Sequence, residues 1–147
     1  MNSALGSGFI LAALACASVG GIVGIVGGLT RQKSVFPWVR WAAAAFFACM
    51  LGANLVMEVA LLTHDFSVSY VAQVGSRATP TLFTIVSLWS ALEGSILFWG
   101  LILGTYVFAF VMAHRKDAPA FVTLATGIML VVGIFFAFLI AGPANPF

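Results

Sequence analysis

Four long apolar runs dominate the pattern of hydrophobic and polar positions along the chain. They cover residues 5–29, 41–62, 94–113 and 120–141. A helix rises about 1.5 Å per residue, so about 20 apolar residues cross a hydrocarbon core of about 30 Å. The pattern therefore predicts an all-α integral membrane protein with four transmembrane helices, in which residues 1–147 form a single membrane domain.

The main polar interruption covers residues 63–93, where we expect an outward loop followed by an interfacial amphipathic helix. The apolar stretch from Pro80 to Ala113 is too long for one span. Its first part has an apolar stripe at helical spacing and hydroxyl groups opposite, as in a helix at a membrane interface. The stripe consists of Leu82, Ile85, Val86, Trp89 and Leu92, and the opposite face of Thr81, Thr84, Ser87 and Ser90.

Local signals divide this interruption further. Residues 66–71 partly alternate between apolar and polar types, which favours an extended or loosely structured segment. Thr79 before Pro80 is typical of a helix N-cap followed by proline at the first helical position. Ser90 and Glu93 have the spacing of a capping box, which predicts that the third span begins there.

The composition agrees with a membrane protein. Hydrophobic residues make up 63% of the chain and charged residues only 7%, whereas about a quarter of a soluble domain is charged. A signal peptide before a soluble domain is excluded because the apolar runs recur along the whole length. The net charge of +2 is too small to indicate a nucleic-acid partner.

The few charges predict the orientation in an inner or cytoplasmic-type membrane. Cytoplasmic loops carry an excess of Lys and Arg. Two turns of the predicted bundle share five basic residues, and the loop on the other side has only Arg77. The five are Arg31, Lys33, Arg40, Arg115 and Lys116. Both termini are therefore expected on the non-cytoplasmic side.

Small residues in the first span indicate helix packing. Gly20, Gly24 and Gly28 recur every four residues, with two further glycines beside them, and such a face allows another helix to approach closely. Cys16 and Cys49 lie in apolar runs without metal-ligand spacing, so we interpret them as core residues.

The sequence predicts no catalytic, cofactor-binding or metal site held by this chain alone. His64 and His114 fall on opposite sides of the membrane and cannot together ligate one haem. His64 is either solvated or orients a ligand. Glu58 either reaches the interface, pairs with Asn54, or belongs to a functional polar seam. Glu93 is either a capping residue or part of a site for an amphipathic ligand or a partner.

The stretch between the second and third spans resembles the CcmF-type haem lyases, a family of cytochrome c biogenesis proteins. The matching residues are Asp65-Phe66-Ser67-Val68, Tyr70-Val71-Ala72, Pro80, Trp89, Glu93-Gly94-Ser95 and Trp99, and a terminal Asn145-Pro146-Phe147. The family pattern is D-F-[ST]-V-x-Y-V-A, a leucine-proline turn, a tryptophan, H-E-G-S and L-W. The resemblance covers the whole chain but only the N-terminal quarter of a family member.

Two departures limit what this resemblance implies. Leu92 stands where the family has the histidine of H-E-G-S, and Ser76-Arg77-Ala78-Thr79-Pro80 stands where the family has the turn S-N-x-x-L-P. In addition, the tryptophan-rich haem-presenting segment W-G-x-W-W-x-W-D does not occur in the chain. The resemblance implies haem for the full assembly and a companion segment that carries the tryptophan-rich motif. A haem carrier and apocytochrome c are further implied partners, besides membrane lipid.

The leading hypothesis is a membrane subunit or N-terminal segment of a haem lyase that supplies scaffold and an outward docking surface. The matching residues of that surface are Asp65, Phe66, Tyr70, Pro80, Trp89, Glu93, Gly94, Ser95 and Trp99. The competing hypothesis is a scaffold or anchor subunit of a respiratory or transport complex, with Asn54, Glu58 and Glu93 lining a polar seam. A third possibility is an inactive fragment of a longer protein.

Overall fold

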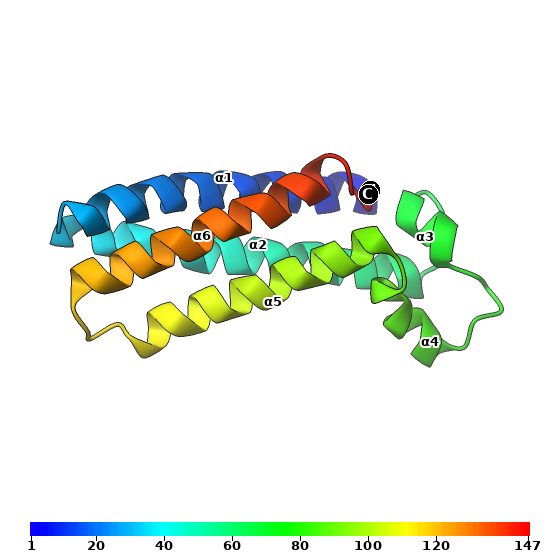
Figure 1. Ribbon diagram of the computed structural model, residues 1–147. Coiled ribbons are helices and arrows are strands. Elements are labelled where there is room, and N and C mark those ends of the chain that lie inside the picture. The colour runs from blue at the N-terminus through cyan, green and yellow to red at the C-terminus, as the bar shows by residue number, and fades with distance from the viewer.

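Four long helices run side by side in the computed structural model, which describes all residues 1–147 (Figure 1). They are α1 (Asn2–Leu29), α2 (Phe36–Leu62), α5 (Leu92–Ala113) and α6 (Pro119–Ala141). Each is long and apolar enough to cross a membrane. There is no strand. The all-α class and the four transmembrane helices predicted from the sequence are confirmed, while the limits of the spans in the bilayer remain a prediction.

The short elements lie at the ends of the bundle. The 3-10 turn η1 (Lys33–Val35) precedes α2, and three short helical pieces connect α2 to α5. These are α3 (Ser69–Val74), α4 (Thr81–Val86) and the 3-10 turn η2 (Ser87–Trp89). Figure 1 shows α3, α4 and both chain termini together at one end. We call this end, comprising residues 63–95, the start of α1 and the tail 142–147, the motif end.

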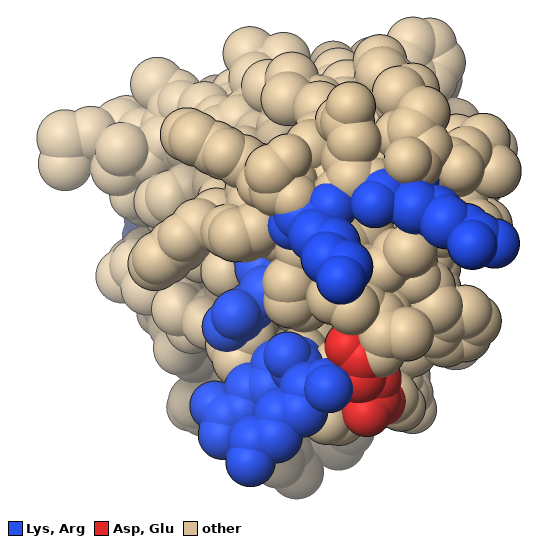
Figure 2. Space-filling view, turned by 90° about the vertical axis from the view of Figure 1, so that its left-hand side faces the viewer, with Lys and Arg blue, Asp and Glu red and all other residues tan.

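The opposite end contains the α1–α2 and α5–α6 turns, and we call it the basic end. Figure 2 views it directly and shows the cationic side chains gathered there. They belong to Arg31, Lys33, Arg40, Arg115 and Lys116. Only Asp117 adds a negative charge to these turns. The charges are thus divided between the two ends as the sequence predicted.

The helices form a ring in which α1 contacts α2 and α6, and α5 closes the ring between them. The α1–α6 contact depends on glycine. A Cβ on Gly24 would stand 2.6 Å from the Cα of Gly127, so neither position tolerates a side chain at this spacing. This confirms that the glycine face of the first span serves helix packing.

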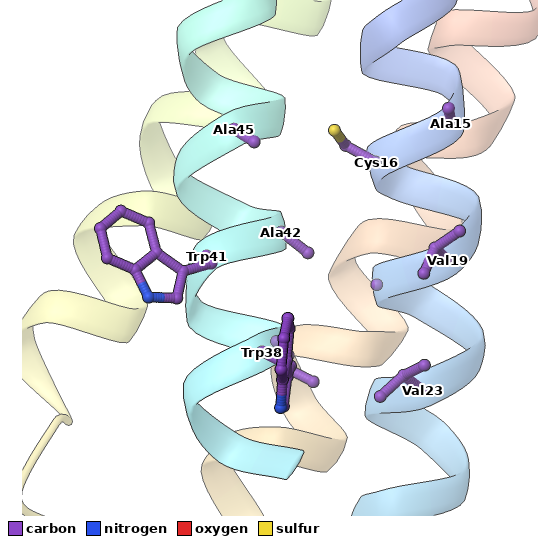
Figure 3. A pocket seen from close by; sticks show the side chains of 10 residues that line it. Ala15, Cys16, Val19, Val23, Trp38, Trp41, Ala42 and Ala45 are labelled. Carbon is purple, nitrogen blue, oxygen red and sulfur yellow. The ribbon is translucent and has the colours of Figure 1, made fainter.

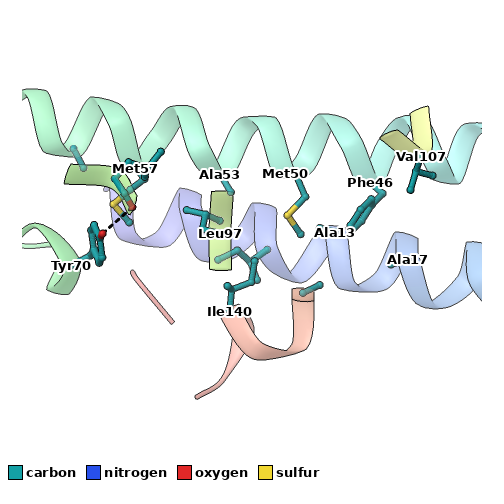
Figure 4. Packing of buried hydrophobic residues seen from close by; sticks show 14 of the residues in the cluster. Ala13, Ala17, Phe46, Met50, Ala53, Met57, Tyr70, Leu97, Val107 and Ile140 are labelled. Atoms are coloured by element: carbon teal, nitrogen blue, oxygen red, sulfur yellow. Dashed lines mark hydrogen bonds between the residues drawn. The ribbon is translucent and has the colours of Figure 1, made fainter. Parts of the chain in front are cut away.

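A buried row of side chains along α2 fills the centre of the ring (Figure 4). Phe46, Met50, Ala53 and Met57 recur at intervals of three or four residues and are fully buried. Leu97 of α5 and Ile140 of α6 belong to the same cluster. Cys16 and Cys49 are free thiols that pack partly buried against it.

Three local predictions about residues 63–93 are wrong. Residues 69–71, the second half of the segment predicted as extended or loosely structured, belong to α3, because Tyr70 and Val71 are buried and anchor a helical turn. Pro80, not Thr79, is the N-cap of α4. The capping box is also absent: the N-cap of α5 is Ala91 without a side-chain bond, since the Ser90 hydroxyl donates to Ser87 instead.

The segment predicted as one interfacial helix is divided into α4 and η2. Its two faces separate as the pattern indicated: Leu82 is 68% exposed, whereas Thr84 is 5% exposed. The apolar stripe therefore points away from the bundle, and Thr84 and Ser87 of the hydroxyl face point toward it, whereas Thr81 and Ser90 are exposed. This orientation suits a segment that is bordered by lipid on its outer side.

Candidate functional site

The motif end begins with a turn that Asp65 organises. One oxygen of its carboxylate, Oδ1, accepts hydrogen bonds from the Ser67 hydroxyl at 2.6 Å and the Ser67 amide at 3.2 Å. The other, Oδ2, accepts one from the Asn2 side chain at 2.9 Å. These bonds, chiefly that of the Ser67 hydroxyl, hold the pKa of the Asp65 carboxyl below its ordinary value. Asp65 thus ties the loop to the start of α1.

His64, just before this turn, adopts a left-handed conformation with φ 52°. It ends α2 in a turn closed by a hydrogen bond from the Asp65 amide to the Ala60 carbonyl, 2.9 Å long. The Nε2 atom of His64 is buried and has no hydrogen-bond partner. Phe66 beside it is 41% exposed, and the Arg77 guanidinium lies 5.9 Å from its ring centroid.

Tyr70 connects the loop to the entrance of α5. Its side chain is buried, and its hydroxyl lies 2.8 Å from the carbonyl oxygens of both Ser87 and Leu88. The Tyr70 hydroxyl oxygen also accepts a hydrogen bond from the Ala91 amide at 3.3 Å. Figure 4 shows Tyr70 at one end of the buried row. Burial raises the pKa of the Tyr70 phenol.

Gly94 packs directly under this tyrosine. A Cβ at position 94 would collide with the Leu88 carbonyl oxygen and the Tyr70 hydroxyl. Only glycine fits at position 94, because residues before α5 fold back onto the first turn of α5 and leave no room for a side chain. Gly94 and Tyr70, 24 positions apart in the sequence, meet in one contact.

The C-terminal tail completes the cluster from the other side. The Pro146 carbonyl accepts hydrogen bonds from the Tyr70 amide and the Ser69 hydroxyl, both at 3.2 Å. The Phe147 ring packs on Gly6, and the Phe147 carbonyl accepts a bond from the Ser3 hydroxyl at 2.9 Å. The two matched stretches, 65–72 and 145–147, are therefore in direct contact.

An open hollow of about 380 Å³ adjoins the cluster on its outer side. It is lined by Trp89, Ser95, Phe98, Trp99 and Ile102. The rings of Trp89 and Phe98 lie 5.6 Å apart, and the Ser95 hydroxyl donates to the Trp89 carbonyl at 2.9 Å. Trp89 is 59% and Trp99 57% exposed. The hollow therefore presents two indole rings to whatever covers this face.

The remaining matched residues lie at the edges of the cluster. Pro80 caps α4 and is exposed. Glu93 is half-buried in the first turn of α5, where a carboxylate suits the helix dipole, and no hydrogen bond holds its side chain. The structure thus brings together Tyr70, Trp89, Gly94, Ser95 and Trp99 at the entrance of α5. Asp65 lies in the neighbouring turn that is tied to α1, and Phe66, Pro80 and Glu93 lie at the periphery.

The pairing considered for Asn54 and Glu58 does not occur. The Asn54 amide donates to the Met50 and Leu97 carbonyls at 2.8 and 3.2 Å, and so joins α2 to α5. Glu58 has a buried oxygen without a partner and lines a small hollow of about 200 Å³ beneath Leu88 and Trp89. Glu58 was not among the matched residues, although a carboxylate in a span was a sequence signal.

Sequence reasoning also missed the supporting residues Asn2 and Ser3 and the carbonyls of Ser87 and Leu88. Asn2 and Ser3 lie before the first predicted span, and nothing in their spacing indicated contact with residues 65 and 147. The backbone carbonyls have no sequence signal at all. The terminal Asn145-Pro146-Phe147 match was the one available indication that the tail belongs to the cluster.

Comparison with known proteins gives a consistent result. No protein-family profile matches the chain. It is 31% identical over 146 residues to the cytochrome c-type biogenesis protein CcmF of Pseudomonas fluorescens, which matches 97% of this chain and 22% of the relative. It is 29% identical over 153 residues to CcmF of Escherichia coli K12, a match that covers 100% of this chain and 23% of the relative.

A solved structure, the cytochrome c heme lyase CcmF, superposes with a TM-score of 0.91 at 34% identity. The superposition covers 100% of this chain and 25% of that protein. The chain thus spans about a quarter or less of the length of the proteins it resembles.

Proposed function

We propose that this chain, a CcmF-type segment that corresponds to the N-terminal part of cytochrome c-type biogenesis proteins of that name, serves a haem lyase. In this proposal it supplies four scaffold helices and a docking surface, the motif end, to the assembly that attaches haem to apocytochrome c. It does not perform the chemistry alone.

The observation that carries this proposal is the agreement over the entire chain with the heme lyase CcmF, at a TM-score of 0.91 and 34% identity. Identity at this level makes it more than a likeness of helix bundles. Three of the matched residues also support the proposal, because Tyr70, Gly94 and Pro146 lie far apart in the sequence and meet in one cluster.

The sidedness of the docking surface follows from charge. Five of the six basic residues belong to the basic end, and cytoplasmic loops are enriched in Lys and Arg. We therefore assign the basic end to the cytoplasmic side of an inner or cytoplasmic-type membrane. Both termini and the motif end then face the non-cytoplasmic side, where apocytochrome c would be met.

The proposed partners are a companion segment that carries a tryptophan-rich motif, a haem carrier and apocytochrome c. The hollow beside Trp89 and Trp99 is the surface best suited to contact them, since exposed aromatic side chains are enriched at protein interfaces. Membrane lipid covers the remaining apolar sides of the helices.

Haem belongs to the full assembly in this proposal, and the residues of this chain do not fit a haem held between two histidines. His64 follows the end of α2 at the motif end, whereas His114 ends α5 at the basic end. His114 instead contacts the Phe110 carbonyl through Nδ1 at 3.0 Å. Leu92, at the position of the family histidine, is 68% exposed and offers no ligand.

The competing role as an anchor subunit with a polar seam is not favoured by the geometry. The Asn54 amide nitrogen donates to two backbone carbonyls while its Oδ1 has no partner, and the hollow at Glu58 has otherwise apolar walls. No hydrogen bond joins Glu58 to Asn54 or to Glu93. The named relatives are cytochrome c biogenesis proteins.

Site-specific cross-linking tests the docking surface directly. A photoreactive phenylalanine analogue at position 99 is expected to capture a component of the cytochrome c maturation machinery in membranes. The matched control carries the analogue at Tyr106, on the same helix and 67% exposed but outside the hollow. Capture that is equal at both positions, or of no maturation component, would contradict the docking role.

A further inference from the structure

A second polar feature lies at the basic end, in a hollow of about 430 Å³ between α2 and α5. Pro37, Arg40, Trp41 and Ala44 line it from one face of α2, and Phe108 and Met112 from α5. Figure 3 shows Trp41 on the side of α2 that faces away from α1. Toward the middle of the bundle the groove is bordered by the rings of Phe47 and Phe108, stacked 5.2 Å apart.

Arg40 is the only charged side chain in this hollow. Its Nε atom is buried without a hydrogen-bond partner, and no ion pair or hydrogen bond joins Arg40 to another residue. The guanidinium carbon of Arg40 lies 5.6 Å from the centroid of the Phe36 ring. Because an arginine side chain stays charged and a buried unpaired donor is costly, this group calls for an anion that the chain does not supply.

The shape of the groove indicates what kind of anion fits. Arg40 lies at the polar end of the bundle, and the walls beyond it, formed by Ala44, Phe108 and Met112, are apolar. An inorganic anion would contact only the Arg40 end of the groove and would leave the apolar walls uncovered. A molecule with an anionic head and a hydrocarbon chain would use both, and anionic lipids are known to occupy basic pockets between transmembrane helices.

We propose that this groove binds one anionic phospholipid, with its phosphate on Arg40 and one acyl chain between α2 and α5. Trp41 borders the groove at the level where indole rings favour the membrane interface. This end of the bundle carries five basic residues and only one acidic residue, Asp117, so its net positive charge also favours an anionic ligand. The site is separate from the motif end and does not depend on the proposed role in haem attachment.

The neighbouring hollow between α1 and α2 lacks this combination. It measures about 420 Å³ and is lined by apolar residues and glycine, among them Trp38 and Cys16 (Figure 3). No charged group there selects a ligand. The α2–α5 groove is distinguished by Arg40 alone, which makes the proposal testable by single substitutions.

Native mass spectrometry of the purified 147-residue chain in detergent measures lipid affinity directly. We expect dioleoyl phosphatidylglycerol to bind about fivefold more tightly than dioleoyl phosphatidylcholine, because both lipids have a phosphate but only phosphatidylglycerol carries a net negative charge beside the Arg40 cation. Arg40→Gln should abolish this preference. Lys33→Gln, which removes the same charge from an exposed residue outside the groove, should change it less than about twofold.

A second variant tests the acyl-chain part without changing charge. Ala44→Leu fills the groove and should lower phosphatidylglycerol affinity, whereas Ala4→Leu, exposed at the far end of α1, should not. Inorganic phosphate should not displace the lipid. Equal affinity for both lipids, equal losses in Arg40→Gln and Lys33→Gln, no effect of Ala44→Leu, or displacement by phosphate would each overturn the proposal.

Discussion

Tyr70 and Gly94 form the central contact of the motif end: the tyrosine hydroxyl occupies the space that a side chain at position 94 would need. Through this contact α3 is joined to the first turn of α5, and the hydroxyl also meets the carbonyls of Ser87 and Leu88. The loop between the second and third spans is thereby fixed in one arrangement. The proposed docking surface depends on this arrangement.

Gly94→Ala should destabilise the protein by about 1–3 kcal/mol, because the added methyl group collides with the Leu88 carbonyl and the Tyr70 hydroxyl. Thermal unfolding in detergent measures the change. Gly8→Ala is the matched control: a Cβ there meets nothing within 4 Å, so this variant should be neutral or slightly stabilised. Equal stability of the two variants would show that the close approach at Gly94 is absent.

Tyr70→Phe should cost about 1–3 kcal/mol, because it leaves the Ala91 amide and the two carbonyls without their buried partner. Tyr106→Phe, at an exposed tyrosine of α5, should have no measurable effect. Since burial raises the pKa of Tyr70, the unfolded state loses its phenol proton at lower pH than the folded state. The wild type should therefore lose stability above about pH 10, and Tyr70→Phe should lose less.

Asp65→Asn should remove part of the acid sensitivity of the fold. Hydrogen bonds from Ser67 and Asn2 lower the pKa of Asp65, so its contribution is present above the unfolded value of about 3.9 and is lost as pH falls through the folded value. The free energy of unfolding should fall less between pH 6 and pH 2 in this variant than in the wild type. Asp117→Asn, at an exposed carboxylate of the basic end, should retain the wild-type acid profile.

Phe147→Ala should release the tail from α1 and weaken its contact with α3, since the Phe147 ring packs on Gly6. Hydrogen exchange should then become faster at the Tyr70 amide, which donates to the Pro146 carbonyl. Phe138→Ala, on the exposed face of α6, is the control and should leave that amide protected. Unchanged exchange in Phe147→Ala would mean that the tail does not need this anchor.

The helical scaffold could be predicted from the sequence because its cause is local. Uncharged runs long enough to span a bilayer must form helices to satisfy their own backbone groups. The spacing of Gly20, Gly24 and Gly28 likewise predicted a close helix contact, which α6 provides.

The interior of the motif end could not be predicted, because its contacts join residues far apart in the chain. The Tyr70 amide bonds to Pro146, and Asp65 to Asn2, with no local pattern to indicate either. The capping box at Ser90 failed for a different, local reason. The Ser90 hydroxyl donates to the Ser87 carbonyl of η2, and the periodic pattern had predicted η2 as part of one longer helix.

The most direct test of the haem lyase role is the level of haem-stained c-type cytochromes in a strain that lacks the gene region encoding this chain. The account predicts that these cytochromes disappear and return with the wild-type sequence. A variant with Trp89→Ala and Trp99→Ala should restore them poorly, and Tyr106→Ala fully. Normal c-type cytochromes in the deletion strain would contradict the role of this chain in cytochrome c maturation.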